Sequence, residues 1–265
     1  MSIKLVGKVT LVGAGPGDPE LLTLKAVRAI EAAEVVVHDR LVAPEILDLI
    51  PADAERVDVG KRTNHHPVPQ DEINALLVGY AKAGRNVVRL KGGDPFIFGR
   101  GCEEAAALAA AGVPYAVVPG ITAAQGAAAS AGVPLTHRGL ARSVRYVTGH
   151  CRADEPLDLD WAGLADRETT LVVYMGRASI REFAAELMAQ GRAGETPVLA
   201  VANATTRDER RLASRLATIE ADIDAAGLAS PVVFIIGEVA GLAEAEIVDV
   251  ALPAGAIVVK EAVYA

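Results

Sequence analysis

The feature that most restricts the possible folds is the stretch NVVRLKGGDPFIFGRGCEE, at residues 86–104. It opens with a short apolar run, interrupted by one arginine, which is typical of a buried strand. Gly92 and Gly93 follow, and two glycines let the backbone turn sharply and let a ligand come close. The chain then enters an Ala-rich helical run. Open α/β sheets bind ligands where a strand ends in such a turn and a helix follows. The stretch therefore predicts an α/β fold with a ligand-binding turn.

Three charged side chains mark this turn as a candidate site. Asp94 lies at its tip, and Arg100 and Glu103 follow at a spacing of three residues. Residues three apart on a helix are neighbours, so Glu103 is expected either to pair with Arg100 or to contact a ligand beside it. Arginine suits the binding of carboxylates, because its guanidinium presents two parallel N–H groups.

Strand and helix patterns alternate along the whole chain. Five strand–helix units precede the segment PLTHRG, which ends near residue 139, and the alternation then starts again. We expect second-half strands at 143–148, 170–175, 197–202 and 231–239, with a helix at 178–190 and an arginine-rich stretch at 207–215. The pattern predicts two α/β domains, residues 1–138 and 139–250, followed by a tail at 251–265, with a cleft between the domains.

Composition excludes several classes of protein. The 265 residues are 51% hydrophobic, which allows a sizeable core, and the net charge of −8 argues against nonspecific nucleic-acid binding. No apolar run reaches roughly 18 residues, so no membrane span is expected. The two cysteines are too few for a disulfide framework and fit a reducing compartment. These observations favour a cytoplasmic α/β protein, and no cluster indicates a metal site.

The first strand leads into a second glycine-rich turn, GAGPGDP, at residues 13–19. Asp18 and Pro19 are suited to the N-cap and first position of a helix, in which Leu21, Leu24, Val27 and Ile30 recur at helical spacing. A dinucleotide-binding fingerprint would require a glycine where Asp18 stands. An acid there would repel a pyrophosphate at the helix N-terminus, although Asp39 could serve as the later acid of that fingerprint.

Six motifs together resemble one family. They are GAGPGDPELLTLKA, HDRLV, VGKR, RLKGGDPFIFGRGCEE, PGITAA and YMG, in this order between about residues 8 and 239. With these motifs the chain resembles the uroporphyrinogen-III C-methyltransferases, a branch of the tetrapyrrole methylases. The resemblance implies two αβα domains of the class III methyltransferase type, with S-adenosylmethionine bound in the cleft between them. It also implies a homodimer that needs no metal.

The resemblance further implies the reaction. Two methyl groups would pass from S-adenosylmethionine to uroporphyrinogen III, giving precorrin-2 by way of precorrin-1, for sirohaem, cobalamin or haem d1 synthesis. The length leads us to expect methylation alone, without the dehydrogenase or chelatase part that is fused to some relatives. The family's cofactor contacts correspond to Pro16, Gly92, Gly93, Asp94, Ile97, Thr122, Ala123, Met175, Ala204 and Val232. Val232 is bulkier than the small residue typical of the family at that position.

The family's proton acceptor and proton donor correspond to Asp39 and Lys61, and its substrate contacts to Arg100, Glu103 and Arg138. The chemistry is consistent with these roles. Methylation of an electron-rich pyrrole carbon leaves a cation that must lose a proton, and a carboxylate at a strand end can accept it. Arginine, with a pKa above about 12, is a poor base and a good partner for a substrate carboxylate. Arg138 could equally be a hinge residue.

Three other functions are compatible with parts of the pattern. The GGDPF turn also occurs in methylases of later corrin intermediates, although the DRLV, VGKR and FGRGCEE stretches favour the early, metal-free substrate. A Rossmann-type oxidoreductase would explain the first glycine-rich turn. A noncatalytic nucleotide-binding module or dimeric scaffold would explain the turns without any chemistry. A comparison of the affinities for NADH and for S-adenosylhomocysteine distinguishes the oxidoreductase from the methylases.

Overall fold

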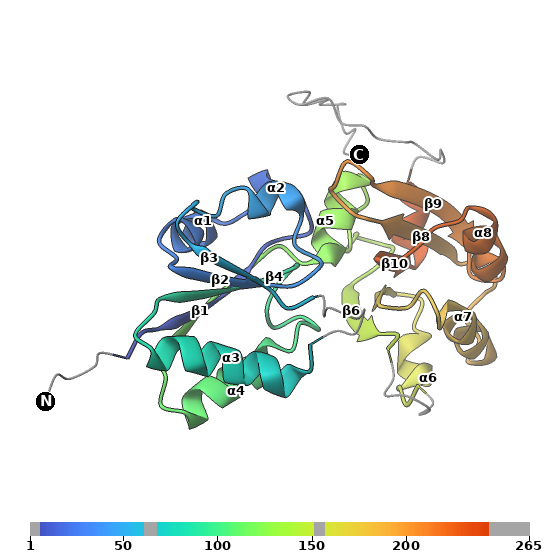
Figure 1. Ribbon diagram of the computed structural model, residues 1–265. Helices are drawn as coiled ribbons and strands as arrows, with labels where there is room; N and C mark the ends of the chain where they lie inside the picture. The colour runs from blue at the N-terminus through green and yellow to red at the C-terminus, as the bar shows by residue number, and fades with distance from the viewer. Residues whose placement is uncertain (1–5, 61–67, 151–156, 244–265) are drawn as a thin grey trace, which may run out of the picture.

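The computed structural model describes residues 6–60, 68–150 and 157–243, and these form two layered α/β domains side by side (Figure 1). The first domain contains five strands: β1 (Val9–Gly13), β2 (Val35–His38), β3 (Glu55–Asp58), β4 (Val87–Lys91) and β5 (Tyr115–Val118). All of them are parallel, in the order β3-β2-β4-β1-β5. The candidate turn follows a strand, as expected, and this strand, β4, is the central one of the sheet.

Helices cover both faces of the first sheet. On one face lie α1 (Leu24–Glu31) and α2 (Pro44–Leu47), which bury Ile30 and Ile46 against Val36 and Leu90. On the other face lie α3 (Gln70–Lys82) and α4 (Gly101–Ala110), whose apolar side chains pack on the alternate residues of the same strands. Burial on both faces explains the Val- and Leu-rich sequences of the inner strands β1, β2 and β4, whereas the edge strands β3 and β5 are largely exposed.

The second sheet is mixed. Its strands are β6 (Ser143–Thr148), β7 (Thr169–Tyr174), β8 (Pro197–Ala202), β9 (Arg210–Arg215) and β10 (Val232–Ile236), in the order β6-β7-β10-β8-β9. Only β6 and β7 are parallel, whereas β10 runs antiparallel to both of its neighbours. The start of β10 therefore lies beside the ends of β7 and β8. The arginine-rich stretch, for which no strand was predicted, forms the edge strand β9.

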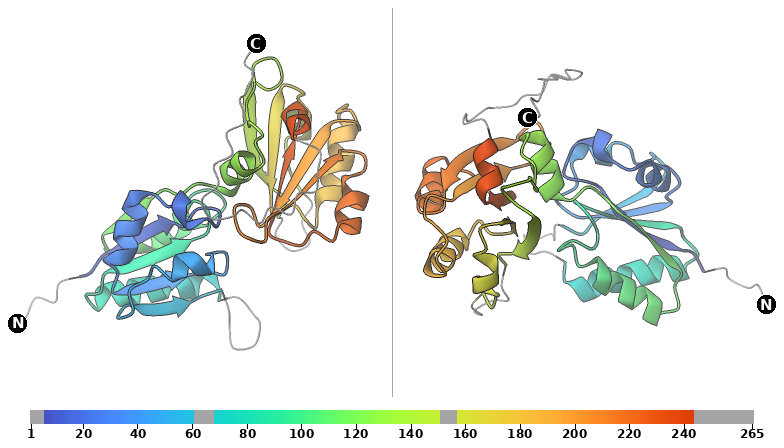
Figure 2. Two further views of the ribbon diagram at one scale, coloured as in Figure 1. Left: turned by 90° about the horizontal axis from the view of Figure 1, so that it is seen from above. Right: turned by 180° about the vertical axis from the view of Figure 1, so that it is seen from behind.

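Helices again cover both faces of this sheet. One face carries α6 (Trp161–Leu164), α7 (Ile180–Ala189) and α8 (Ile219–Ala225), packed around Phe183 and Phe234. The other face carries α5 (Ala123–Ser130) and the 3-10 helix η2 (Glu238–Leu242). The prediction of two αβα domains is thus confirmed (Figure 2).

Helix α5 precedes the expected boundary at residue 138 but packs on the second sheet. Its sequence AAQGAAAS allows this, because small side chains let the helix backbone approach the sheet closely. The boundaries at residues 138 and 250 remain predictions, and the expected tail at 251–265 lies outside the described residues.

The first helical segment differs in detail from the expectation. Asp18 and Pro19 do begin a helix, but it is a short 3-10 helix, η1 (Pro19–Leu21). Helix α1 begins separately after Thr23, whose hydroxyl accepts a hydrogen bond from the Ala26 amide. Because this cap sets the phase of the helix, Ala26 and Ile30 are buried and Leu24 is 76% exposed.

None of the helices in the described part of the chain combines the length and apolar character that crossing a membrane requires.

Candidate active site

Three turns of the first domain pack tightly at the carboxyl edge of its sheet. They follow the adjacent strands β4, β1 and β5. A Cβ atom on Gly120 would lie 2.3 Å from the Gly93 carbonyl oxygen, and one on Gly13 would lie 2.5 Å from the Gly120 amide nitrogen. Gly15 and Gly93 exchange two backbone hydrogen bonds of 3.1 and 2.7 Å. The glycines of these motifs therefore serve first to let three backbones touch.

Asp94 joins two of these turns. One carboxylate oxygen accepts a 2.8 Å hydrogen bond from the Phe96 amide, and the other accepts a 3.0 Å hydrogen bond from the Gly120 amide. Hydrogen bonds from backbone N–H groups to a carboxylate are stronger than those between neutral groups. The charge at the tip of the GGDP turn thus has a structural task, and its partly buried carboxylate also brings negative charge to the site.

The second domain contributes the turns after β7 and β8. Met175 follows β7 and is 49% exposed, whereas Ala204 follows β8 and is buried. Val232 begins β10 and pairs with Ala202 at the end of β8. Because β10 is antiparallel to β7 and β8, its first residue lies at the edge where those strands end. The three cofactor positions expected from this domain therefore share one edge of the second sheet.

The two sets of turns contact each other. The Asp18 amide donates a 3.1 Å hydrogen bond to the Thr205 hydroxyl. A Cβ atom on Gly17 would lie 2.4 Å from the Thr206 methyl group. Pro16 packs against Gly126 of α5, where an added Cβ would lie 2.5 Å from the proline ring. The expected cofactor positions of both domains are therefore brought to one junction.

Tyr174 forms a buried connection across this junction. Its hydroxyl lies 2.7 Å from the Thr122 hydroxyl and accepts a 3.1 Å hydrogen bond from the Ala124 amide. Burial raises the pKa of Tyr174, while the hydrogen bonds with Thr122 and Ala124 lower it. Burial is the larger influence, so the pKa of Tyr174 lies above its usual value and the hydroxyl stays protonated at neutral pH. The Phe98 ring packs on the same tyrosine at 5.0 Å between centroids.

Replacing Tyr174 by phenylalanine is expected to destabilise the protein by about 1–3 kcal/mol, because the Thr122 and Ala124 groups lose a buried partner. Urea denaturation of both proteins measures this difference. Tyr146→Phe is the matched control: its ring lies 5.7 Å from that of Tyr174, but the two hydrogen bonds belong to Tyr174 alone. An equal loss in both variants would contradict this role of the Tyr174 hydroxyl.

Backbone strain is concentrated at the same junction. The non-glycine residues with positive φ in the described part of the chain are Phe98, Arg100, Met175, Asn203 and Thr205. All of them lie in the turns after β4, β7 and β8. Positive φ is costly for residues with a side chain and persists where the surrounding structure enforces it, commonly at binding sites. The strained residues therefore lie in the same turns as several of the cofactor positions expected from the motifs.

Asp39 lies beside this region, directly after β2, which neighbours β4. One oxygen of its carboxylate accepts a 3.0 Å hydrogen bond from the Leu41 amide, and its side chain is 27% exposed. The other oxygen lies 3.7 Å from a guanidinium nitrogen of Arg89. Asp39 is thus fixed in place and still accessible, as a proton acceptor must be. Lys61, its expected proton-donating partner, lies outside the described residues.

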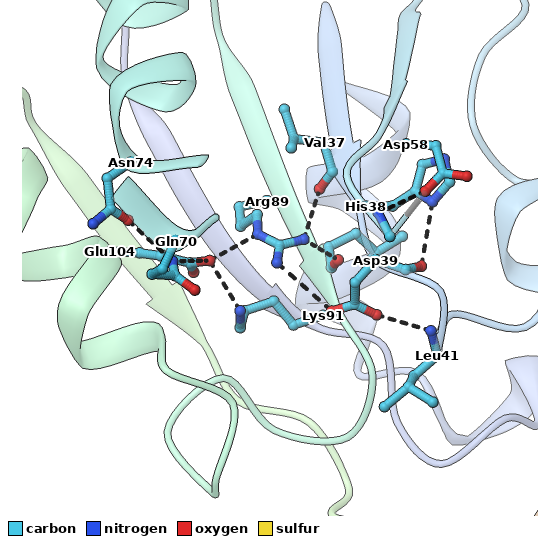
Figure 3. Close-up of polar contacts among 12 residues, drawn as sticks. Val37, His38, Asp39, Leu41, Asp58, Gln70, Asn74, Arg89, Lys91 and Glu104 are labelled. Carbon is cyan, nitrogen blue, oxygen red and sulfur yellow. Dashed lines mark hydrogen bonds and ion pairs between the residues drawn. The ribbon is translucent and has the colours of Figure 1, made fainter. Parts of the chain in front are cut away.

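Behind Asp39 lies a buried cluster of charges that was not predicted as part of the site (Figure 3). Arg89 and Lys91 of β4 are each 3% exposed, and both donate to the same oxygen of Glu104, at 2.9 and 3.0 Å. Burial lowers the pKa of Lys91, the Arg89 charge lowers it further, and Glu104 and Asp39 oppose the shift. The sequence feature that could have indicated this cluster is the presence of two cations, Arg89 and Lys91, on one face of a strand expected to be buried.

The expected substrate contacts are distributed differently. Arg100 and Glu103 form a two-pronged ion pair of 2.8 and 2.7 Å on the surface, which confirms their helical pairing. This hydrogen bond with Glu103 raises the pKa of Arg100. Arg138 lines a hollow of about 400 Å³ with His137 and Arg142, before the amino end of β6. Because β6 is parallel to β7, this hollow lies at the opposite edge of the sheet from Met175.

The remaining expected positions belong to the junction. Gly92 lies against Leu41, since an added Cβ would be 2.8 Å from the leucine Cβ. Gly93 has φ +68°, and an added Cβ would meet Ala123 no closer than 3.9 Å. Ile97 packs partly buried at the edge of the α5 cluster. Among the described residues no group of three metal-ligating side chains is found.

Comparison with known proteins gives a consistent result. The family model of tetrapyrrole (corrin/porphyrin) methylases matches residues 8–220. The uroporphyrinogen-III C-methyltransferase of Paracoccus denitrificans is 56% identical over 248 residues, which cover 94% of this chain and 85% of that protein. Siroheme synthase 1 of Yersinia enterocolitica is 52% identical over 236 residues, which cover 89% of this chain but only 49% of that protein. This chain thus spans about half the length of that synthase.

A solved structure extends the comparison to three dimensions. The uroporphyrin-III C-methyltransferase of Thermus thermophilus, in complex with S-adenyl homocysteine, has a TM-score of 0.74 and 46% sequence identity. The match covers 89% of this chain and 100% of that one. The chain therefore belongs to the tetrapyrrole methylase family and, within it, to the uroporphyrinogen-III C-methyltransferases.

Proposed function

We propose that this protein methylates carbon atoms of uroporphyrinogen III with S-adenosylmethionine, in two transfers that give precorrin-2 by way of precorrin-1. The main support is the combination of 56% identity to a curated uroporphyrinogen-III C-methyltransferase with a junction where the motif turns of both domains meet beside Asp39. A complex of the Thermus relative with S-adenyl homocysteine supports the choice of methyl donor.

The residues at the junction fit this donor. Asp94 brings a negative charge, which matches the sulfonium and ammonium groups of S-adenosylmethionine. Phe96 and Met175 are 54% and 49% exposed and offer apolar surface to an adenosine. We propose that Pro16, Gly92, Gly93, Asp94, Ile97, Thr122, Ala123, Met175, Ala204 and Val232 hold the donor. Val232 has a buried side chain and contributes mainly through its backbone.

When bound, the donor supplies an electrophilic methyl group and its own leaving group. The protein needs no nucleophile, and its task is alignment, which can lower a barrier by roughly 7–11 kcal/mol. The tight packing of the three glycine turns and the Tyr174 connection supply the required rigidity. We propose that the Asp39 carboxylate accepts the proton lost by the substrate after methyl transfer, with Lys61 as proton donor.

We propose that Arg100 and Glu103 act as a unit towards the substrate. Their ion pair orients the guanidinium, which keeps further N–H donors for one of the eight carboxylates of uroporphyrinogen. Arg138 is proposed to contact a carboxylate remote from the donor, because its hollow lies at the opposite edge of the second sheet from Met175. A few local arginines can attract an anionic substrate in this way despite the net charge of −8.

We further propose that the protein acts in the cytoplasm as a homodimer. The cysteine content and the absence of a candidate span among the described helices agree with the first part of this statement. The product would serve sirohaem, cobalamin or haem d1 synthesis. The siroheme synthase relative is consistent with the first of these branches.

The test is incubation of the pure protein with methyl-labelled S-adenosylmethionine and uroporphyrinogen III. We expect a red-fluorescing product that carries two labels per macrocycle. If this substrate gives no labelled product and a later corrin intermediate is methylated instead, the protein is a methylase of later corrin intermediates. Titration with NADH is the second control, since tight NADH binding without S-adenosylhomocysteine binding would favour an oxidoreductase.

A further inference from the structure

The first observation is that β4 places two cations in an apolar layer. Side chains alternate between the faces of a strand, so Val87, Arg89 and Lys91 point to the face covered by α3 and α4. Val87 packs there with Leu77 and Leu108. Arg89 and Lys91 are each only 3% exposed on the same face. Buried charges of this kind are rare unless they are paired.

The second observation is that a single carboxylate balances both cations. Glu104 of α4 is fully buried, and one of its oxygens accepts hydrogen bonds from Arg89, Lys91 and Gln70, at 2.9, 3.0 and 3.3 Å. Its second oxygen has no hydrogen-bond partner within the described part of the chain. Glu104 therefore collects donors from β4 and from α3 at one point (Figure 3).

The third observation is that Arg89 connects the buried Glu104 carboxylate to the accessible Asp39 carboxylate. Its Nε donates to Glu104, while its Nη2 lies 3.7 Å from the Asp39 carboxylate. Its Nη1 donates to the carbonyl oxygens of Val37 and Leu90, at 3.4 and 3.2 Å. The guanidinium is thus held by hydrogen bonds from Nε and Nη1, and its third nitrogen, Nη2, faces Asp39.

Stability alone does not account for this cluster. Replacing a buried set of ions by apolar residues of similar volume is often neutral or stabilising, because the charges no longer have to be desolvated. The surrounding layer already consists of Val, Leu and Ile side chains that could fill the space. A costly cluster that extends to the accessible Asp39 carboxylate is therefore explained better by the needs of the site.

We propose that Glu104, with Lys91 as its second counter-charge, is a positioning residue that holds the Arg89 guanidinium against the carboxylate of Asp39. Arg89 then keeps that carboxylate in the orientation in which it accepts the proton of the substrate. Glu104 and Lys91 touch neither substrate nor methyl donor. The inference rests on the proposed function only in the role given to Asp39.

The test uses a variant that leaves the net charge unchanged, Lys91→Met with Glu104→Met. It removes one cation and one anion, and it leaves Arg89 and Asp39 as an ion pair without the anchor. We expect the full-length variant to bind S-adenosylhomocysteine like the wild type while kcat falls by about 10–100-fold, since a displacement of about 1 Å in an active site can cost that much.

A conservative second variant, Lys91→Met with Glu104→Gln, keeps an oxygen that can accept from the Arg89 Nε. It should retain more activity than the methionine variant, and an equal loss in both would overturn the proposal. This variant also provides the test should the methionine variant fail to fold. Arg215→Met with Glu195→Gln removes a surface ion pair of the second domain and is the matched control, with kcat expected to be unchanged.

The decisive measurement repeats the Lys91→Met, Glu104→Met pair in an Asp39→Asn background. If Glu104 acts through Asp39, the pair causes no further loss of kcat there, because coupled residues are not additive. The same fold loss in both backgrounds would overturn the proposal. The kcat of each variant is compared with that of its parent protein, measured with the substrate that the parent methylates. A wild type that is inactive with uroporphyrinogen III would therefore refute the proposed function without deciding the role of Glu104.

Discussion

Asp39→Asn is expected to lower kcat by about 10²–10⁴-fold, the usual contribution of a general base. Asparagine has nearly the same shape and keeps an oxygen for the 3.0 Å hydrogen bond from the Leu41 amide, so the turn after β2 should persist. The change removes only the capacity to accept a proton and the charge opposite Arg89. Affinity for S-adenosylhomocysteine should therefore stay at the wild-type value.

The measurement is single-turnover methyl transfer together with calorimetric titration of S-adenosylhomocysteine. Asp58→Asn is the matched control, because Asp58 ends the neighbouring strand β3 and accepts a 2.8 Å hydrogen bond from the Gly60 amide in the same way. Asp58→Asn should keep full activity. Undiminished turnover of Asp39→Asn would remove Asp39 from the mechanism, and equal losses in both variants would point to the general charge of this sheet edge.

The strand and turn structure of the first domain was accessible from the sequence because its signals are local. Short runs with apolar residues between turn signals identify the five strands, whereas their order in the sheet depends on packing that the sequence does not record. In the second domain β9 was missed for a physical reason. Its arginines look like a solvated loop, and only the pairing with β8 at the sheet edge makes the segment a strand.

The buried charges show a different limit of sequence reasoning. Glu103 and Glu104 are adjacent and chemically alike, yet Glu103 pairs with Arg100 on the surface while Glu104 is fully buried. Neighbouring helical residues point about 100° apart, so the residue at which α4 begins decides which of them faces the sheet. Helix α4 begins after Arg100, which has φ 58° in the left-handed region, and this conformation cannot be predicted from the sequence.

The glycine motifs are recognisable in the sequence, but the contacts that they make within the protein are not. Ligand binding at Gly92 and Gly93 stays a prediction, and the structure adds that Gly92 lies against Leu41 while Gly13 and Gly120 lie against backbone atoms of neighbouring turns. Asp94 was expected to meet the cofactor, and both of its oxygens accept backbone hydrogen bonds. Such contacts join residues far apart in sequence, which a single chain without its fold cannot reveal.

Gly120→Ala is expected to destabilise the protein by about 3 kcal/mol or more, because overpacking and a lost hydrogen bond to a charged group combine. The new Cβ would lie 2.3 Å from the Gly93 carbonyl oxygen and 2.9 Å from the Gly13 Cα, both rigid backbone atoms. Relief requires the turn after β5 to move away from the turn after β4. That movement breaks the 3.0 Å hydrogen bond from the Gly120 amide to Asp94.

The displaced turns carry proposed donor contacts on both sides, so binding of S-adenosylhomocysteine should weaken by at least about tenfold, equivalent to 1.4 kcal/mol. Gly79→Ala is the matched control: nothing lies within 4 Å of its added Cβ in α3, and alanine favours a helix over glycine by about 1 kcal/mol. Urea denaturation and calorimetry measure both effects. A Gly120→Ala protein as stable as Gly79→Ala, with unchanged affinity, would mean that the three turns are not locked together, and the alignment attributed to them would lose its structural basis.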